Sequence, residues 1–363
     1  MPEFVAPLHA IKGRGSATRL PHRFASESRE AFDDGWSTVE GDAAGDPVAC
    51  PPTQVWLEDV KSVITRNDSP DIPFDLSINP YRGCEHGCCY CYARPTHSYL
   101  NLSPGLDFET RIIAKRNLAE VLRRELGARR YRPSLLNIGS ATDGYQPVER
   151  DLRLTRAAIE VLQEACHPFS VVTKGSGVER DLDLIAPMAA RGLAAVYVTI
   201  TTLDARLARC MEPRAAAPQR RLRTITTLAR AGVPVGVSVA PQIPFLNTDM
   251  EQVLEAAWTA GARSAFYTVL RLPWEVAPLF RQWLELHYPE RAERVLARVR
   301  DLRGGRLYDA DFATRMAGHG VWADLLRQRF EKTCARLGYN RQRVELDLSR
   351  FRPPRTPGQI GLF

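Results

Sequence analysis

The sequence lacks the features that would anchor the chain in a membrane or staple it with disulfides. No apolar run reaches the roughly 18 residues that span a bilayer. The first residues lack the charged start and the apolar stretch of a signal peptide. The chain has only eight cysteines in 363 residues, and four of them crowd one short stretch, which argues against a disulfide framework. We therefore expect a cytoplasmic protein with free thiols and no membrane partner.

Composition allows a large folded core and a modest preference for polyanions. With 44% hydrophobic residues, a chain of this length can bury a core of one large domain with appendages or of two domains. Lysine and arginine number 49 against 42 acidic residues, a net charge of +7. This balance is compatible with a nucleic-acid partner, although many basic proteins bind none.

The crowded cysteines have the spacing of a metal-cluster loop. Cys84, Cys88 and Cys91 form a Cys-x3-Cys-x2-Cys triplet, with Tyr90 just before the last cysteine. Three thiolates on a short loop can bind three irons of a cubane cluster and leave the fourth iron open. Cys89 could be a ligand only by displacing Cys88 from this spacing, so we interpret it as a packed thiol.

A zinc site is the main alternative for these cysteines. It would need a second Cys-x2-Cys pair, or histidines at ligand spacing, to complete four ligands. His86 lies within the triplet, but no His-x3-5-His pair exists to finish a zinc finger. The cysteines outside the loop are isolated: Cys50, Cys166, Cys210 and Cys334. The sequence therefore favours the iron-sulfur interpretation.

Short apolar segments alternate with longer amphipathic ones from about residue 70 onward. The segments without helical spacing predict strands over 76–79, 134–139, 169–173, 195–201, 233–239 and 265–270. Between and after them, helical periodicity predicts helices over 118–126, 156–165, 181–190, 218–231, 250–260, 274–287, 293–302 and 321–337. Alternation of strand and helix indicates an α/β fold of parallel βα units, here six, which would form an open partial barrel.

Polar residues follow the predicted strands at their carboxyl ends, where barrel enzymes place their active sites. The first strand leads into the cysteine triplet, and later strands end in polar segments. These segments are 139–149, 173–176, 199–202 and 240–244.

The cysteine triplet with its aromatic residue resembles the signature of the radical S-adenosylmethionine (SAM) superfamily. This resemblance implies a [4Fe-4S] cluster on Cys84, Cys88 and Cys91, with SAM as the second cofactor. It implies that the cluster reductively cleaves SAM to a 5'-deoxyadenosyl radical, which abstracts hydrogen from a substrate. It also implies the partial (β/α)6 barrel of TIM type that the alternating pattern indicates, and an electron donor such as a reductase or a flavodoxin-type protein.

Further stretches resemble one branch of that superfamily, the DNA repair photolyase-like proteins related to spore photoproduct lyase. The resemblance covers about residues 55 to 335, and within the branch it is to a bacterial group with an N-terminal extension. The stretches that carry it are 142–149, 173–174 with 180–184, 199–204, 212–214 and 231–236. This branch implies lyase or repair chemistry on nucleic acid.

The resemblance also implies which polar residues bind SAM. Ser140, Thr142 and Asp143 would face its amino group, and Lys174 would bond its carboxylate in a charge-assisted contact. The threonines that end the fourth strand would approach the ribose. The full predicted set is Tyr90, Ser140, Thr142, Asp143, Lys174, Thr199, Thr201 and Arg221.

The chain departs from spore photoproduct lyase at the residue that returns hydrogen to the product. That enzyme uses a cysteine near the end of the second strand, whereas this chain has Ala141 there and no cysteine between Cys91 and Cys166. The same repair route is therefore doubtful. Tyr145 is the residue we predict to act as a catalytic hydrogen relay, with Tyr92 and Tyr99 as alternatives and a packing role as the simpler interpretation.

Three functions are compatible with these patterns. The first is a radical SAM enzyme that acts on nucleic acid. The second is a radical SAM enzyme that modifies a peptide or a small molecule, although no further cysteine group has the spacing of an auxiliary cluster. The third is a non-enzymatic iron-sulfur protein that senses redox state or recruits partners, and it predicts no SAM binding.

Outside the barrel, the sequence predicts three further regions. Residues 1–55 are expected to form a flexible extension, 56–275 the barrel, 276–345 a helical cap and 346–363 an extended tail. The tail resembles the peptide by which bacterial replication and repair proteins dock on the sliding clamp. Its contact residues would be Gln359, Ile360, Leu362 and Phe363, with docking on the chain's own barrel as the alternative.

Overall fold

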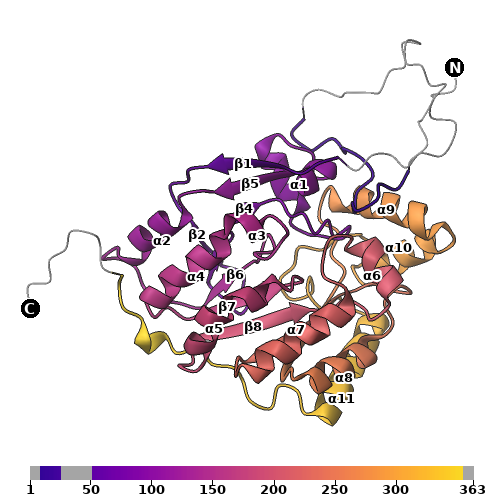
Figure 1. Cartoon of the computed structure of the whole chain (residues 1–363). Coiled ribbons are helices and arrows are strands. Elements are labelled where there is room, and N and C mark those ends of the chain that lie inside the picture. The colour runs from indigo at the N-terminus through magenta and orange to yellow at the C-terminus, as the bar shows by residue number, and fades with distance from the viewer. Residues whose placement is uncertain (1–8, 26–50, 355–363) are drawn as a thin grey trace, which may run out of the picture.

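The main element of the fold is an open, seven-stranded sheet wrapped by helices. The computed structural model of the chain describes residues 9–25 and 51–354 (Figure 1). The strands lie in the order β10-β9-β8-β7-β6-β3-β2. Their bounds are β2 Ile64–Arg66, β3 Leu76–Ile78, β6 Leu136–Ile138, β7 Phe169–Thr173, β8 Ala194–Thr199, β9 Val235–Gln242 and β10 Ser264–Val269. The six predicted strands are all present and pair in parallel, and only β2 is antiparallel, to β3.

Helices cover the sheet because its strands are apolar on both faces. In β8, all residues but Tyr197 are buried, which requires a second layer. Figure 1 shows the helices following one another along the sheet: α2 Leu118–Leu126, α4 Leu154–Glu164, α5 Leu182–Ala189, α7 Pro218–Arg230 and α8 Met250–Ala260. The predicted partial barrel is thus confirmed, and the sheet of described strands is not closed, since β10 and β2 are its edges.

A second, three-stranded sheet escaped the sequence analysis. It consists of β1 Gln54–Glu58, β5 Arg111–Lys115 and β4 Tyr81–Arg82, in the order β1-β5-β4. The pattern of β1 hid it because four of its five residues are exposed, without the alternation of a half-buried strand. Short elements surround it and the cluster loop: η1 Arg94–Leu100, α1 Leu106–Thr110, α3 Glu149–Leu152, η2 Gly177–Asp181 and α6 Ala205–Met211.

The C-terminal helices complete two different cores. Helices α9 Val276–His287 and α10 Ala292–Asp301, joined by η3 Pro289–Arg291, share an apolar cluster with Cys88, Cys89 and Tyr90. Helix α11 Val321–Leu337 instead packs against α8, and η4 Leu348–Arg350 follows it. The cap therefore reaches the cysteine loop through α9 and α10, with Leu307 packed against the same cluster. Gln359, Ile360, Leu362 and Phe363 lie outside the described residues.

Of the predicted extension 1–55, the structure describes residues 9–25 and 51–55, and residues 9–25 contact the rest of the chain. Residues 9–25, here called the N-terminal strap, lie against the cysteine loop and α9. Thr18 Oγ1 donates to Gln282 Oε1 at 2.8 Å, and Gly15 N donates to Glu109 Oε2 at 2.9 Å. The contact is tight, since a Cβ on Gly15 would lie 1.7 Å from the carbonyl oxygen of Gly87. The strap is held by polar contacts, which its low hydrophobicity did not indicate.

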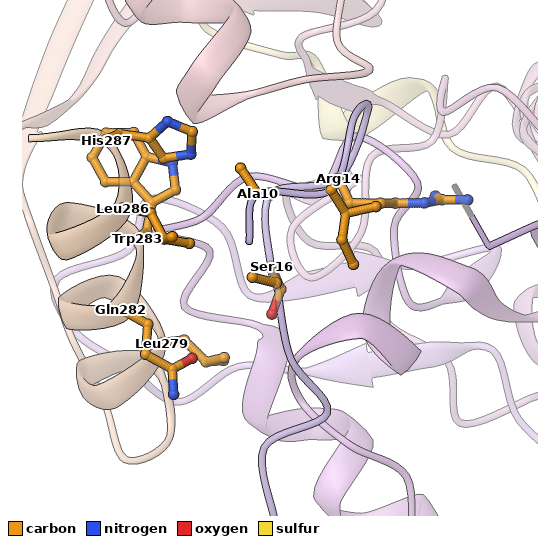
Figure 2. A pocket seen from close by; sticks show the side chains of 11 residues that line it. Ala10, Arg14, Ser16, Leu279, Gln282, Trp283, Leu286 and His287 are labelled. Atoms are coloured by element: carbon orange, nitrogen blue, oxygen red, sulfur yellow. The ribbon is translucent and has the colours of Figure 1, made fainter. Parts of the chain in front are cut away.

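A small hollow separates the strap from α9, as Figure 2 shows. The indole of Trp283 and the imidazole of His287 lie on its helix side, while Arg14 points away from α9. Arg14 instead donates to the carbonyl oxygen of Glu109 at 3.1 Å and to that of Pro51 at 2.6 Å. The hollow contains none of the predicted site residues.

We expect the protein to lose stability as the pH falls from 6.5 toward 4. Burial lowers the pKa of His97 and of His167 to about 4. As the pH falls, each of these histidines is protonated near pH 6.5 in the unfolded chain but only near pH 4 in the folded chain. Acid therefore favours unfolding. At pH 5 each histidine should cost about 2 kcal/mol. Urea unfolding at pH 7 and pH 5 measures this difference.

The contacts of His167 identify a control for this prediction. Its Nδ1 lies 2.8 Å from the carbonyl oxygen of Pro168, so that nitrogen carries the proton and donates it. Its Nε2 then accepts from the Tyr131 hydroxyl at 2.7 Å. The variant His167→Gln should show about half of the wild-type pH dependence in this window. Equal unfolding midpoints for the wild type at both pH values would contradict the assignment.

Candidate active site

The three cysteines of the triplet lie on one loop between β4 and η1, at the carboxyl end of the main sheet's first parallel strand. Cys84 and Cys88 are buried and Cys91 is half-buried. The loop is tied to its surroundings by its backbone, since Cys84 N donates to Phe108 O at 2.9 Å and Cys89 N to Met211 O at 3.0 Å. Gly87 has a φ of +67°, and a Cβ there would lie 2.6 Å from the Glu109 carboxylate. Only glycine fits this turn of the loop.

The thiols fit a cluster better than they fit a lone ion. Among residues 9–25 and 51–354, no three His, Cys, Asp or Glu side chains are grouped so that they could hold a single metal ion. In a cubane cluster each thiolate binds a separate iron, so the sulfurs are not required to converge. Burial raises the pKa of Cys88 to about 12, and Lys174 opposes this rise. A bound metal removes such thiol protons outright.

A buried ion pair supports the loop from behind. Arg94 and Glu109 are fully buried, with 2.5 Å between Arg94 Nη2 and Glu109 Oε1. Arg94 also donates to the loop carbonyls of Cys88 at 2.9 Å and Gly87 at 3.1 Å. Its Nη1 donates to the carbonyls of Pro104 and Gly105. All five donor directions of this guanidinium are therefore used, four on backbone carbonyls and one on Glu109.

Lys174 supplies an uncommitted positive charge beside the loop. It follows β7, and its Nζ lies 5.8 Å from the centre of the Tyr90 ring. Within the described part of the chain, this amine makes no hydrogen bond and no ion pair within 4 Å. Burial lowers the pKa of Lys174, but the charges of Cys88 and Glu212 outweigh burial and raise it above its ordinary value. The amine is thus a cation free to meet an anionic ligand.

Glu212 is the buried anion of the site, and the sequence analysis gave it no role. Its carboxylate accepts bonds from the Tyr90 hydroxyl and the Arg221 guanidinium, and from Thr201 Oγ1 at 2.5 Å. Burial raises the pKa of Glu212, but Arg221 and Lys174 outweigh burial and lower it to about 2. The sequence analysis did single out the stretch 212–214, which begins with Glu212 directly after α6. A sequence does not show, however, that a carboxylate is buried.

The guanidinium of Arg221 is hydrogen-bonded to other groups of the protein from all three of its nitrogens. Besides Glu212, it donates from Nη1 to the carbonyl of Thr199 at 3.0 Å and from Nε to that of Ala216 at 2.6 Å. These bonds leave its guanidinium little capacity for SAM, so the structure favours a positioning role for Arg221. Thr199 itself is buried in β8, beside the Ser238 position of β9.

Asp143 connects the cysteine loop with the ends of two strands. Its Oδ1 accepts from Thr173 Oγ1 at 2.7 Å and Tyr145 N at 2.9 Å, and its Oδ2 accepts from Lys174 N at 2.7 Å. His86 Nδ1 lies 3.2 Å from Oδ2. Burial raises the pKa of Asp143, but His86 and these donors lower it further, well below its usual range. The carboxylate is therefore ionised, and hydrogen-bond donors of the protein already bind both of its oxygens.

The remaining predicted residues lie at the same sheet edge and make fewer hydrogen bonds through their side chains. Ser140 Oγ accepts from Asn79 Nδ2 at 3.3 Å, and Thr142 is buried with its hydroxyl 3.4 Å from the carbonyl oxygen of Tyr81. Tyr145 is buried, and its hydroxyl donates to Asp181 Oδ2 at 3.1 Å. Asp181 also pairs with Arg156 and Arg180. The Tyr145 hydroxyl thus belongs to a structural ion-pair network, and a relay role for it stays a prediction.

Comparison with known proteins identifies the domain around this site. Residues 78–257 match the model of the radical SAM superfamily, which uses a [4Fe-4S] cluster and SAM. The predicted cofactors and the resemblance to this superfamily are thereby confirmed.

Two relatives by sequence extend the similarity to other organisms. An uncharacterised protein of Mycobacterium tuberculosis is 38% identical over 226 residues, which cover 61% of this chain and 66% of that protein. An uncharacterised protein of Methanocaldococcus jannaschii is 27% identical over 216 residues, or 60% of this chain and 77% of that protein. The chain therefore spans just under two thirds of the mycobacterial protein's length.

Among solved structures, this chain resembles spore photoproduct lyase. A mutant of that enzyme superposes with a TM-score of 0.53 at 17% identity, covering 78% of this chain and 79% of the other. Spore photoproduct lyase complexed with dinucleoside spore photoproduct gives a TM-score of 0.53 at 16% identity. At such low identity the likeness establishes the fold.

Proposed function

Because the chain carries a radical SAM domain, we propose that it is a radical SAM enzyme whose substrate is a nucleic acid. Cys84, Cys88 and Cys91 would hold the [4Fe-4S] cluster. The observation that carries the radical SAM part of the proposal is the Lys174 amine, unpaired within the described residues, beside a loop of three buried or half-buried thiols. When bound, the two cofactors supply reductive cleavage of SAM and a 5'-deoxyadenosyl radical that abstracts hydrogen.

The protein's own part in this chemistry is binding and orientation. Lys174 would bond the carboxylate of SAM, in an interior where such a charge-assisted bond is strong. Glu212 holds the Tyr90 hydroxyl and Thr201, so the loop aromatic stays next to β8. Asp143 accepts a hydrogen bond from the backbone of Lys174 and lies 3.2 Å from His86 Nδ1, so it positions the loop beside the end of β7. We propose that Ser140 and Thr142 bond the SAM amino group, and Thr199 and Thr201 the ribose.

A nucleic-acid substrate is supported by the fold and the charge. Spore photoproduct lyase has the same fold and is known in complex with a dinucleoside lesion. The present chain carries a net charge of +7, which favours polyanions. Lyase or repair chemistry is part of this proposal. The hydrogen relay differs from that enzyme's, since no cysteine lies between Cys91 and Cys166, and Tyr145 or Tyr92 would take that role.

The proposal predicts release of 5'-deoxyadenosine from SAM. Anaerobically reconstituted protein with dithionite should produce it, because dithionite would reduce the cluster, and Lys174 and the open iron would hold SAM where the cluster can pass the electron to it. Lys174→Ala should lower the rate by about 10- to 100-fold through weaker SAM binding, as for other charge-assisted contacts of roughly 1.5–3 kcal/mol. Chromatography of the quenched reaction measures the product.

A surface lysine provides the control for this experiment. Lys61 is exposed, so Lys61→Ala should match the wild type. Intact SAM after strong reduction would contradict the proposal and favour a redox-sensing or recruitment protein. Candidate substrates labelled with deuterium test the substrate class. If a labelled peptide, and no labelled nucleic acid, transferred deuterium into 5'-deoxyadenosine, the substrate would be a peptide. The electron donor and docking of the tail on a sliding clamp stay predictions.

A further inference from the structure

A row of exposed aromatic side chains leads away from the cysteine loop. Among the described residues, the large apolar side chains left exposed include Tyr92 at 48%, Trp274 at 60% and Tyr99 at 70%. Phe24 of the strap and Phe312 are exposed as well. Tyr92 directly follows the last cysteine of the triplet, so the row starts at the candidate active site. We call these five residues, with the half-buried Tyr308, the aromatic row.

Arginines lie over five of these six rings. Arg23 lies over three of them, with its guanidinium carbon 4.4 Å from the ring centre of Trp274, 4.7 Å from Phe24 and 5.2 Å from Tyr99. Trp274 in turn lies 6.1 Å from Tyr308. At the other end, Arg271 lies 5.2 Å from the Tyr92 ring. Arg315 lies 4.5 Å from the Phe312 ring.

The row rests on fixed supports. Arg23 pairs with Glu275 at 2.9 Å, and Arg315 pairs with Asp71 at 2.5 Å. The loop that carries Tyr308 and Phe312 is held at the end of β10 by the buried Arg303, which donates to the carbonyls of Leu270 and Thr314. Exposed rings that are held this firmly lose little freedom when a ligand stacks on them.

Arg271 differs from the other two arginines because no carboxylate among the described residues forms an ion pair with it. In the part of the chain that the structure describes, its only hydrogen bond is a long one from Nη1 to the sulfur of Met316 at 3.5 Å. Its Nε is buried and makes no bond. An unpaired guanidinium next to the cysteine loop is a binding group for an anion, and its planar fork suits phosphate.

We propose that the aromatic row binds unpaired bases of a single-stranded nucleic acid, with Arg271 bonding the phosphodiester nearest the active site. This inference rests on the proposed function and specifies the form of its substrate. Bases of any identity stack on aromatic side chains, and arginine contributes cation–π contacts and phosphate bonds. A duplex hides the faces of its bases within the stack, so the row selects a single strand or a region that has been opened.

The test measures binding of a fluorescein-labelled single strand of about 15 nucleotides to the full-length, reconstituted protein. Fluorescence anisotropy should show tighter binding of the single strand than of the matching duplex. Trp274→Ala should weaken binding by roughly 5- to 100-fold, since each stacked base contributes about 1–3 kcal/mol. Arg271→Ala should reduce the slope of log Kd against log salt by about 0.7.

Trp56 provides a matched control, because it is also an exposed tryptophan with an arginine over its ring. Arg111 lies 5.9 Å from its centre, and Trp56 is 44% exposed on β1, outside the row. Trp56→Ala should bind the single strand like the wild type. If Trp274→Ala folds poorly by circular dichroism, Tyr99→Ala tests the same surface, since that side chain is still more exposed.

Two results would overturn the inference. One is equal single-strand affinity of the Trp274→Ala, Tyr99→Ala and Trp56→Ala variants. The other is stronger capture of an acidic peptide than of the single strand, lost in Trp274→Ala, which would assign the row to peptides. Cleavage of SAM by the wild type is measured separately. Its absence would refute the proposed function, while tight single-strand binding through the row would still stand.

Discussion

Replacing Cys84, Cys88 or Cys91 with alanine is expected to remove the iron-sulfur cluster. Each substitution deletes one of the three sulfurs that would bind separate irons, and no other cysteine has the spacing to replace it. Iron content after anaerobic reconstitution should fall from about four per chain to near zero. Formation of 5'-deoxyadenosine should fall with it. Iron assay and the visible absorption of the cluster measure the first effect without any activity.

Cys89→Ala is the matched control because it removes a thiol from the same loop. Cys89 is 2% exposed and lies in the apolar cluster shared with α9 and α10. Loss of its sulfur shortens a packed side chain and leaves the triplet spacing intact. Iron content near that of the wild type is the expected result. Equal loss of iron from Cys89→Ala and Cys88→Ala would show that the ligand assignment is wrong.

Arg94→Met is expected to destabilise the protein by about 3–5 kcal/mol, since it leaves the Glu109 carboxylate buried without its partner. The substitution also leaves the carbonyls of Gly87 and Cys88 without their donors. The loop that carries the cysteines should loosen, and iron content should fall together with the free energy of unfolding. Anaerobic urea unfolding followed by circular dichroism measures the first effect.

Arg116→Met tests the opposite case of an arginine pair in solvent. Arg116 pairs with Asp59, and their side chains are 63% and 51% exposed. Solvent screens the attraction in such an exposed pair, so the variant should unfold close to the wild-type midpoint. Equal urea midpoints for Arg94→Met and Arg116→Met would show that the buried pair does not stabilise the protein.

The parallel sheet could be predicted because each strand is a short apolar run between helices of clear periodicity. The predicted helix over 118–126 matches α2, and the strand over 169–173 matches β7. Boundaries shifted at the strand ends, as for β9, which continues to Gln242 three residues beyond the expected Val239. β1 was missed because its register with β5, 57 residues away, determines it, and its own exposed side chains carry no pattern.

At the site, the cysteines were predictable from local spacing, whereas their supports were not. Arg94 and Glu109 are separated by 15 residues, and nothing in a sequence tells a buried arginine from an exposed one. Arg221 was predicted to complete the SAM site, and the structure shows its guanidinium bonded to Glu212 and to two carbonyls. The groups that Arg221 bonds depend on which backbone carbonyls the fold leaves unpaired. A sequence alone does not show these carbonyls.

The contacts of the strap have a consequence for the order in which the chain assembles. Gly15, Thr18 and Arg23 of the strap contact Glu109, Gln282 and Glu275, so the strap can complete its contacts only after residues more than 250 positions further along the chain are in place. Closing so long a loop is slow, and it comes after the local βα units have formed. Until then the cysteine loop lacks the contacts that Gly15 makes with Glu109 and Gly87 on that side.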